Sequence, residues 1–406
     1  MSNIITGLDI GSSSIKGVVA GTGKDGRLSI VTVFKHPSAG FHKGVLIDAD
    51  EAVSVLHDIA RDLEKISKGA VKNVYRNVNS EHIKARASRG IVAVARSDQE
   101  IQEEDVDRVI QASRAVKLLP NHSVLHNITR EYFVDDVGDI LDPISMTGSR
   151  LEVSTLIIEG FSPQVTFLTK HVEHAGLRIG GLIFNPLASA RAVLSKRQKD
   201  LGSVLIDFGA DTTTLVVYEE NKVSHTKSIP LGSSYITKDI AIGLKTSFDV
   251  AEELKVSYGY ALSKDVSRKD TVKLSEFDPD SKDEVSRRFL SEIIEVRLAE
   301  ILDLVNNELK SIDCAGRLPG GAVITGGGVK LEGIGDLVKQ TLKLPVQTGI
   351  SNLGTFEVMN PTHQSLLEDP EFSTAAGLAL WGTEGRARME YNPQNLVKTI
   401  FKNLMP

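Results

Sequence analysis

The chain has 406 residues, which is enough for two or more domains or for one large unit with two lobes. Apolar residues make up 41% of it and charged residues 25%, a balance typical of globular proteins rather than of disordered ones. The formal net charge of −6 argues against a nucleic acid partner, because binding to a phosphate backbone needs a basic surface.

The cysteine content and the first residues bear on the compartment. One cysteine, Cys314, excludes a disulfide framework, and we expect it to be a buried structural residue in a reducing compartment. The opening MSNIITGLDIG lacks the basic and apolar regions of a signal peptide. Apolar runs stay well below the roughly 18–20 residues that cross a bilayer. We therefore expect a cytoplasmic protein without a transmembrane helix.

The chain begins with a pattern of short strands. IITGLDIGSSSIKGVVAG predicts two strands joined by a turn of glycine and serine, and RLSIVTVFKH predicts a third. The GTGKDG between them fits the dinucleotide-binding pattern GxGxxG, but strand-like residues follow it instead of a helix, so we interpret it as a hairpin turn. Apolar spacing then predicts a helix over 50–68 and a strand over 74–83.

Residues 82–163 are expected to form a compact inserted unit. ARASRGIVAVAR alternates like a strand, and the acidic first turn of SDQEIQEEDVDRVIQASRAV indicates the start of a helix. Strand-like runs between 122 and 158 are interrupted by DDVGDILDPISMTG. After this unit, residues 164–195 predict a helix, a strand and another helix.

A second strand pattern begins near residue 202 and parallels the first. LIDFGADTTTLVV and GLDIGSSSIKGVV share an apolar strand ending on Asp-x-Gly, then small hydroxyl residues, then another apolar strand. Their aspartates, Asp9 and Asp207, lie 198 positions apart (207 minus 9). This repeat suggests two related lobes that face each other.

The rest of the chain is mixed. Residues 236–312 are rich in helical patterns, and LPGGAVITGGGVKLEGIGDLVKQTL predicts a strand, a glycine turn and a helix. Residues 354–371 resemble a loop, and STAAGLALWG predicts a closing helix of small residues.

The two Asp-x-Gly turns are candidates for phosphate binding. Successive backbone N–H groups in such a turn form a concave nest that suits phosphate oxygens, and turns on facing lobes would clamp a polyphosphate from both sides. Asp9 and Asp207 are placed to hold Mg²⁺, through water, beside the phosphates, and Lys16 adds a positive charge. The other candidate residues of the two turns are Gly11, Ser12, Ser13, Ser14, Gly209, Ala210, Thr212 and Thr213.

Two further groups are candidates for the nucleoside. Gly326, Gly327 and Gly328 follow a predicted strand, and their lack of side chains lets the backbone pass close to a base and ribose. Glu252 and Lys255 lie one helical turn apart, either as a solvated charge pair or as contacts to ribose and purine.

These motifs together resemble the actin-like ATPase superfamily, and the chain resembles the FtsA family of bacterial cell-division proteins over nearly its whole length. The resemblance rests on six strings: IVAVARSDQEIQEEDVDRVIQASR, LHNITREYFVDDVGDILDPISMTGSRLEV, AEELKVSYG, RRFLSEIIEVRLAEI, LPGGAVITGGGVKLEGI and the opening GLDIGSSSIKGVV, which contains the first turn. The first two are the most specific, because in that family they build a subdomain called IC.

The resemblance implies an α/β, actin-like (ribonuclease H-like) fold with two lobes around an ATP cleft and an FtsA-type IC insertion. The implied subdomains are IA at 1–81 plus 164–197, IC at 82–163, IIA at 198–235 plus 313–374 and IIB at 236–312, followed by a closing helix at 375–390 and a short linker with a membrane-targeting helix at 391–406.

Three positions depart from the family pattern. Ala210 and Asp211 stand where many relatives carry glycines, and Asp211 either weakens anion binding or points outward. In FNPLASARAV, Asn185 stands where the superfamily often places a Glu or Gln that orients the attacking water. An amide holds water but cannot accept a proton as a base would. We therefore expect slow hydrolysis at most, with ATP acting mainly as a structural switch.

The resemblance also implies partners. The family forms head-to-tail filaments and binds the C-terminal peptide of the tubulin-like FtsZ through subdomain IIB. Arg297 and Glu300 match the family's motif in that subdomain. The alternative is that these two charges, three residues apart, form only a solvated pair on a helix surface. Other proteins of the division machinery are expected to bind through subdomain IC.

The final segment, NPQNLVKTIFKNLMP, predicts an amphipathic helix that binds anionic membrane lipid, as in the family. The alternative is that its apolar stripe packs back onto the protein. A helix this short is marginal in water, so one copy should bind weakly and a filament tightly. The residues concerned are Leu396, Val397, Ile400, Phe401, Leu404 and Met405, with Lys398 and Lys402 beside them. We expect a peripheral protein on the cytoplasmic face of the membrane at the division site.

Three other families share the ATP clamp. A sugar or carboxylate kinase should also have a catalytic aspartate and a larger substrate cleft, neither of which is evident. The pilus-assembly scaffold PilM shares the insertion but lacks a lipid-binding end, and rod-shape actins such as MreB lack the insertion.

Overall fold

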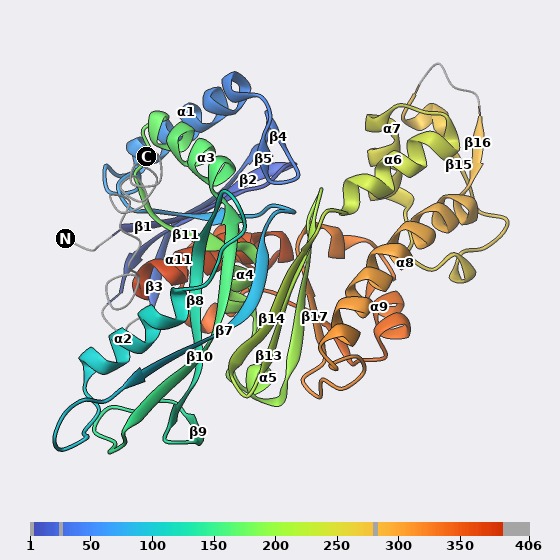
Figure 1. Ribbon diagram of the computed structural model, residues 1–406. Helices are drawn as coiled ribbons and strands as arrows, with labels where there is room; N and C mark the ends of the chain where they lie inside the picture. Colours follow the sequence, from blue (N-terminus) through green and yellow to red (C-terminus); the bar gives the residue numbers. More distant parts are fainter. Residues whose placement is uncertain (1–3, 24–26, 279–282, 385–406) are drawn as a thin grey trace.

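The protein is described here from a computed structural model, which covers residues 4–23, 27–278 and 283–384. Two lobes, each built on its own sheet, lie side by side, and a third sheet extends from the first lobe (Figure 1). Of the helices in the described ranges, none has the length and apolar character needed to cross a membrane.

Lobe I contains a six-stranded sheet in the order β11-β6-β1-β2-β3-β19. β1, β2 and β3 are antiparallel neighbours, as the sequence predicts, and β6 and β11 add parallel strands at one side. The strands are β1 (Ile4–Ile10), β2 (Ser14–Thr22), β3 (Leu28–Pro37), β6 (Val74–Val78), β11 (Ile179–Phe184) and β19 (Phe356–Glu357). A small hairpin, β4 (Phe41–His42) with β5 (Val45–Leu46), follows β3.

Lobe II repeats the arrangement. Its sheet has the order β14-β13-β12-β17-β18, and β17 runs parallel to β12 as β6 does to β1. The strands are β12 (Ser203–Phe208), β13 (Thr213–Glu219), β14 (Lys222–Ile229), β17 (Ala322–Thr325) and β18 (Val346–Thr348). The two meanders inferred from the repeated sequence are therefore confirmed as the matching halves of the fold.

The insertion is a four-stranded sheet in the order β7-β10-β8-β9 with one helix packed on it. Its small core includes Ile101, Val109, Leu151 and Val153, each fully buried. The elements are β7 (Lys84–Ala93), α2 (Glu103–Arg114), β8 (His122–Val134), β9 (Val137–Ile140) and β10 (Arg150–Phe161). The sheet lies beside β14 of lobe II, where Lys222 Nζ is 2.6 Å from Asp139 Oδ1 (Figure 1).

Two helices, α4 (Asn185–Val193) and α11 (Ser373–Glu384), form the junction between the lobes. α11 packs on β1 and β2 of lobe I, and α4 packs on α11 and on β12 and β13 of lobe II. Their contact is very close: a Cβ added at Gly377 would lie 1.8 Å from the carbonyl oxygen of Ala188. A short helix, α5 (Lys196–Leu201), then leads into β12. One hydrophobic core consequently runs from lobe I through this pair to the facing side of the lobe II sheet.

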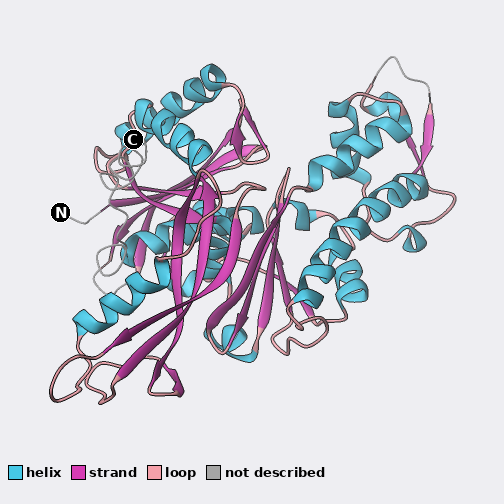
Figure 2. Cartoon of the chain, viewed as in Figure 1, coloured by secondary structure: helices cyan, strands magenta, loops and turns pink. Residues whose placement is uncertain are grey.

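The remaining helices cover the outer faces. On lobe I these are α1 (Ala49–Ile66), α3 (Ser162–His174) and α10 (Pro361–Glu368). On lobe II they are α6 (Ser233–Leu244), α7 (Phe248–Tyr258), α8 (Arg287–Ser311) and α9 (Ile334–Leu342), with the strand pair β15 (Thr271–Lys273) and β16 (Glu284–Ser286). Figure 2 shows these helices of lobe II on the side away from the insertion.

Most of the elements predicted from the sequence are confirmed, with one clear error. Residues 354–371 were expected to be a loop, yet they contain α10, whose N-terminus is capped by Asn360 with Pro361 in its first turn. Eight residues offer too little periodicity to reveal a helix. Cys314 is buried, as predicted.

Candidate nucleotide-binding site

The two Asp-x-Gly turns have the same geometry. In the first, Ile10 pairs with Ile15 and the Gly11 N–H donates to the Ser14 carbonyl at 3.2 Å. In the second, Phe208 pairs with Thr213 and the Gly209 N–H donates to the Thr212 carbonyl at 3.0 Å. Each pair of equivalent positions differs by the same 198 residues, so the repeat holds at the level of individual hydrogen bonds.

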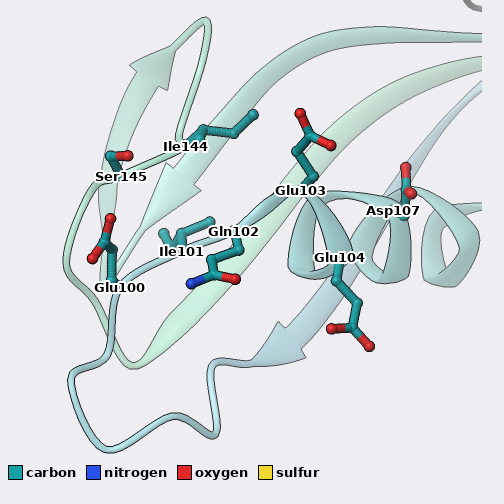
Figure 3. Close-up of a pocket in the computed structure, with 8 residues that line it drawn as sticks. All are labelled: Glu100, Ile101, Gln102, Glu103, Glu104, Asp107, Ile144 and Ser145. Atoms are coloured by element: carbon teal, nitrogen blue, oxygen red, sulfur yellow. The ribbon is translucent and has the colours of Figure 1, made fainter.

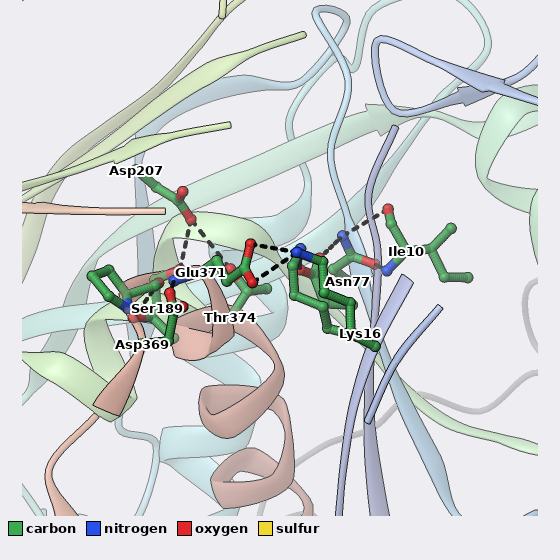
Figure 4. A network of polar contacts seen from close by, with 12 residues as sticks. Ile10, Lys16, Asn77, Ser189, Asp207, Asp369, Glu371 and Thr374 are labelled. Atoms are coloured by element: carbon green, nitrogen blue, oxygen red, sulfur yellow. Dashed lines mark hydrogen bonds and ion pairs between the residues drawn. The ribbon is translucent and has the colours of Figure 1, made fainter. Parts of the chain in front are cut away.

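Asp9 lies at the end of β1 in a buried polar network, of which Figure 4 labels Ile10, Lys16 and Asn77. Its carboxylate accepts from Lys16 Nζ at 3.3 Å and from Asn77 Nδ2 at 2.8 Å, and Asn77 Oδ1 also accepts the Ile10 N–H at 2.8 Å. Burial raises the pKa of Asp9, although Lys16 opposes the rise. The predicted positive charge of Lys16 is thus present in the site, where it is paired with Asp9.

Asp207, the equivalent residue in lobe II, accepts from hydroxyl groups at the lobe junction. Ser189 Oγ on α4 donates at 2.9 Å and Thr374 Oγ1 on α11 donates at 3.2 Å (Figure 4). Burial raises the pKa of Asp207, and the negative charge of Asp9 raises it further. The negative charge of Asp9 thus reaches Asp207, and a cation held by both carboxylates would relieve their repulsion.

The strand pairs that carry the two turns are the first hairpin (β1 and β2) and the second hairpin (β12 and β13). The glycine turn after β17 packs against the second hairpin. Gly326 has a φ of +89°, and a Cβ there would lie 2.3 Å from Asp207 Oδ1. A Cβ at Gly328 would lie 2.9 Å from Phe208 Cβ. Only glycine fits at position 326, since both the backbone conformation and the neighbouring carboxylate exclude a side chain.

Glu252 and Lys255 connect to the second hairpin through α6. The Ser233 and Ser234 N–H groups donate to the carbonyls of Gly209 and Ala210, at 3.0 and 2.8 Å. Lys255 Nζ donates to the Ser233 carbonyl at 3.3 Å and to Glu252 Oε2 at 2.6 Å. Lys255 is buried, which lowers its pKa, so this is not the fully solvated pair that was one of the two interpretations. Contact with ribose and purine stays a prediction.

Asn185 begins α4, next to the last residue of β11. In the part of the chain that the structure describes, its Oδ1 is buried without a hydrogen-bond partner. Buried polar atoms rarely remain unpaired, so this oxygen is suited to accept a hydrogen bond from a bound water or ligand.

One of the two expectations for Asp211 was that its side chain points outward, and this is wrong. Its carboxylate is buried and crosses to lobe I, where Oδ2 accepts the Lys43 N–H at 2.8 Å and lies 3.0 Å from His42 Nδ1. On the same side of the molecule, Asn79 Nδ2 of lobe I donates to Thr212 Oγ1 at 2.6 Å. The second hairpin therefore contacts lobe I directly.

Several residues of this network were not predicted from the sequence. Glu371, for example, accepts from Lys35 Nζ of lobe I at 2.8 Å and lies 3.4 Å from Lys330 Nζ, beside the glycine turn. Asp9 is contacted by Asn77, which lies 68 positions away in the sequence. Asp207 is contacted by Ser189 and Thr374, which lie 18 and 167 positions away. No local motif marks them, because only the fold brings such distant residues together.

The candidate partner residues lie apart from this site, on α8. Arg297 is already held within the chain: Nε and the second guanidinium nitrogen donate to Asp239 of α6 at 2.6 and 3.0 Å, and it also pairs with Glu300. The Glu300 side chain is half exposed. Arg297 thus ties α8 to α6, and binding of a partner there stays a prediction.

A separate hollow of about 590 Å³ lies at the end of the insertion remote from α3 (Figure 3). Its lining is Glu100, Ile101, Gln102, Glu103, Glu104, Asp107, Ile144 and Ser145. Two of its four acidic residues, Glu103 and Glu104, belong to the first turn of α2, where the helix dipole favours negative charge. The helix dipole therefore explains the presence of that pair.

The predicted membrane-binding residues, Leu396 to Met405, lie outside the described residues.

Comparison with known proteins agrees with the architecture. The model of the family described as "Cell division protein FtsA" matches residues 204–377, and the model "SHS2 domain inserted in FTSA" matches residues 80–159. Cell division protein FtsA of Bacillus subtilis is 34% identical over 93% of this chain and 83% of its own length. The proteins of the same name from Pseudomonas aeruginosa and Escherichia coli are 31% identical (94% of this chain, 89% of the relative) and 29% identical (99% and 96%).

Solved structures show the same fold at lower identity. The structure of a PilM-PilN type IV pilus biogenesis complex matches with a TM-score of 0.67 and 19% identity, covering 94% of this chain and 98% of the other. MreB5 of Spiroplasma citri bound to AMPPNP matches with a TM-score of 0.54 and 13% identity, covering 100% of both chains. Similarity at this level establishes the actin-like fold and nothing more specific.

Proposed function

This chain belongs to the FtsA family of cell-division proteins, and from that premise we propose that it is an ATP-binding cytoskeletal protein that polymerises and tethers the FtsZ ring to the cytoplasmic membrane. The observation that supports the proposal is the pair of matching hairpin turns, whose aspartates, Asp9 and Asp207, are both buried and interact electrostatically.

The residues of the site fit a magnesium nucleotide. Backbone N–H groups in the two turns suit phosphate oxygens, and two interacting buried carboxylates suit a divalent cation that keeps some of its waters. Gly326 leaves the backbone bare beside Asp207, where a side chain would block a close approach. Asp9 and Asp207 would hold Mg²⁺, and the glycine and hydroxyl residues of the two turns would hold the phosphates. When bound, the metal supplies neutralisation of phosphate charge.

Hydrolysis is proposed to be slow. The unpaired Oδ1 of Asn185 is suited to orient a water at the lobe junction. An amide oxygen takes up no proton at neutral pH, so this residue can position the water but cannot activate it as a general base. ATP would therefore act mainly as a switch between the lobes, whose contacts already pass through the second hairpin.

The proposed partners follow from family membership and from the sequence. The FtsZ C-terminal peptide is proposed to bind subdomain IIB near Glu300, with Arg297 holding α8 against α6 beneath it. Copies of this chain are proposed to join head to tail, and the insertion to bind other division proteins. The residues of the final segment named above are proposed to fold on anionic lipid, which would make the protein peripheral to the membrane at the division site.

A test that addresses nucleotide and membrane together is electron microscopy of the purified full-length chain on lipid monolayers with magnesium ATP. We expect filaments on the lipid, and none when Asp9 and Asp207 are both replaced by Asn. Removal of residues 396–406 should abolish co-sedimentation with liposomes but leave nucleotide binding intact. Filaments that form equally well with the double variant would contradict the nucleotide part of the proposal, and unchanged co-sedimentation would contradict the membrane part.

The PilM-like alternative is supported by the fold alone. The PilM-PilN structure shares the architecture at 19% identity, whereas the FtsA relatives reach 34% with nearly full coverage. The kinase alternative has no observation in its favour.

A further inference from the structure

The carboxylate of Asp211 sits among donors from both lobes. Oδ1 accepts from Ser234 Oγ at 2.7 Å, and Oδ2 accepts the Lys43 N–H at 2.8 Å and lies 3.0 Å from His42 Nδ1. The Ser12 hydroxyl, from the first hairpin turn, also lies near enough to affect its pKa. Burial opposes ionisation of Asp211, but these donors outweigh it and the pKa is lowered. A full negative charge is thus held between the two turns.

The donors around Asp211 are of the kind that a phosphate group also uses. They are a backbone N–H in a tight turn, two hydroxyls and an imidazole, arranged from two sides. The turn is formed by residues with consecutive positive φ values, Lys43 at 50° and Gly44 at 72°, which aim the N–H toward the second hairpin. The terminal phosphate of a nucleotide bound by both turns would accept hydrogen bonds from these same donors.

The first hairpin shows that the charge is not a requirement of the turn. Subtracting the repeat offset of 198 from 211 gives position 13, and Ser13 there is small, neutral and exposed. The two turns otherwise share their pairing and their internal hydrogen bond. The carboxylate is therefore a feature added to one of two equivalent turns, at the point where that turn meets the opposite lobe.

We propose that Asp211 sets the nucleotide preference of the site: its carboxylate occupies the donors that the terminal phosphate of a nucleoside triphosphate needs, so a triphosphate binds only by displacing it and a diphosphate is favoured. The inference rests on the proposed nucleotide site. It also makes Asp211 a brace that holds the second hairpin against the 41–46 turn when no terminal phosphate is present.

The decisive measurement is calorimetric titration of the full-length chain with magnesium ADP and with magnesium AMPPNP, which removes the complication of hydrolysis. In the wild-type chain the diphosphate should bind more tightly. Asp211→Gly and Asp211→Asn should each lower the ratio of the AMPPNP to the ADP dissociation constant by at least about tenfold, the size expected from removing one like charge a few ångströms away. The affinity for ADP should change less than threefold.

Asp303→Asn is the matched control, because it removes the same charge from an exposed position on α8 and should leave the ratio unchanged. The asparagine variant at 211 keeps the size of the side chain, so it tests the charge even if the glycine variant folds poorly. Hydrogen exchange offers an independent readout: amides of residues 41–46 should lose protection in nucleotide-free Asp211→Gly and regain it with AMPPNP.

The outcomes separate this inference from the proposed function. A folded wild-type chain and variants that bind neither nucleotide would overturn the nucleotide site, and this inference with it. Binding of both nucleotides with a ratio that the substitutions leave unchanged, or a wild-type chain that prefers AMPPNP, would overturn the role of Asp211 alone.

Discussion

His126 illustrates how burial determines the protonation state of a single residue. It lies on β8, where the insertion meets lobe I, and its Nε2 accepts the Phe184 N–H at 3.0 Å. Burial lowers its pKa to about 4. The ring is therefore neutral in the folded protein at physiological pH, and it contacts the strand that leads directly into Asn185.

Protonation of His126 should contribute to the pH dependence of the free energy of unfolding. The unfolded chain takes up a proton on His126 near its ordinary pKa of 6.5, whereas the folded chain does so only near 4. Its contribution is thus fully present above pH 6.5 and is lost as the pH falls toward 4, by at most about 3 kcal/mol. Urea denaturation from pH 4 to 7 should show a shallower loss of stability for His126→Gln than for the wild type. His57→Gln, on an exposed position of α1, should follow the wild-type curve; identical curves for both variants would contradict the assignment.

At the scale of elements, the sequence was most informative where the signal is local. The two Asp-x-Gly turns were predictable because apolar alternation, an aspartate and small hydroxyl residues all fall within about a dozen positions. The contacts that complete the site were not: Asp9 meets Asn77 and Asp207 meets Thr374 across separations of 68 and 167 residues. The 41–46 turn, which reaches the second hairpin, gave no chemical signal of its own.

The junction of α4 and α11 should be intolerant of even one added methyl group. At Gly377 an alanine Cβ would overlap the Ala188 carbonyl, so Gly377→Ala must separate the two helices and should cost about 1–3 kcal/mol of unfolding free energy. Gly335→Ala is the control, since nothing lies within 4 Å of its Cβ in the first turn of α9, so the change should leave the unfolding free energy unchanged or raise it slightly. Guanidinium denaturation measures both. Equal stabilities for the two variants would show that the helices are not in close contact.

At the scale of the whole molecule, the hydrophobic cores divide the chain differently from the sheets. Leu205 and Val216 of the lobe II sheet belong to the core that fills lobe I and surrounds α4 and α11, while the opposite side of that sheet packs on the lobe II helices. The tip of the insertion has a small core of its own. The repeat in the sequence predicted two lobes, but it could not predict that they share a core, because that depends on the packing of α4 and α11.

The separate core of the insertion predicts that a leucine-to-alanine change has different consequences there and in the core shared by the two lobes. Leu151→Ala and Leu205→Ala each remove a fully buried leucine from a strand, at a typical cost of about 2–5 kcal/mol. For Leu151 the damage should stay within the insertion, so hydrogen exchange should rise over 84–161 while nucleotide affinity is retained. For Leu205 exchange should rise in both lobes and nucleotide affinity should fall. Loss of nucleotide binding in Leu151→Ala would show that the insertion and the lobes unfold as one unit.

The two matching hairpins differ in the residue that pairs with the aspartate. Lys16 stands opposite Asp9 in the strand register, and the corresponding position in the other half, opposite Asp207, is Thr214. Two identical hairpins would present the same groups to both halves of a ligand, but here a lysine lies on one side and a threonine on the other. An elongated ligand between the lobes would therefore meet two chemically distinct sides, with Lys16 on one and Asp211 and Thr214 on the other, and we expect it to bind in a single orientation.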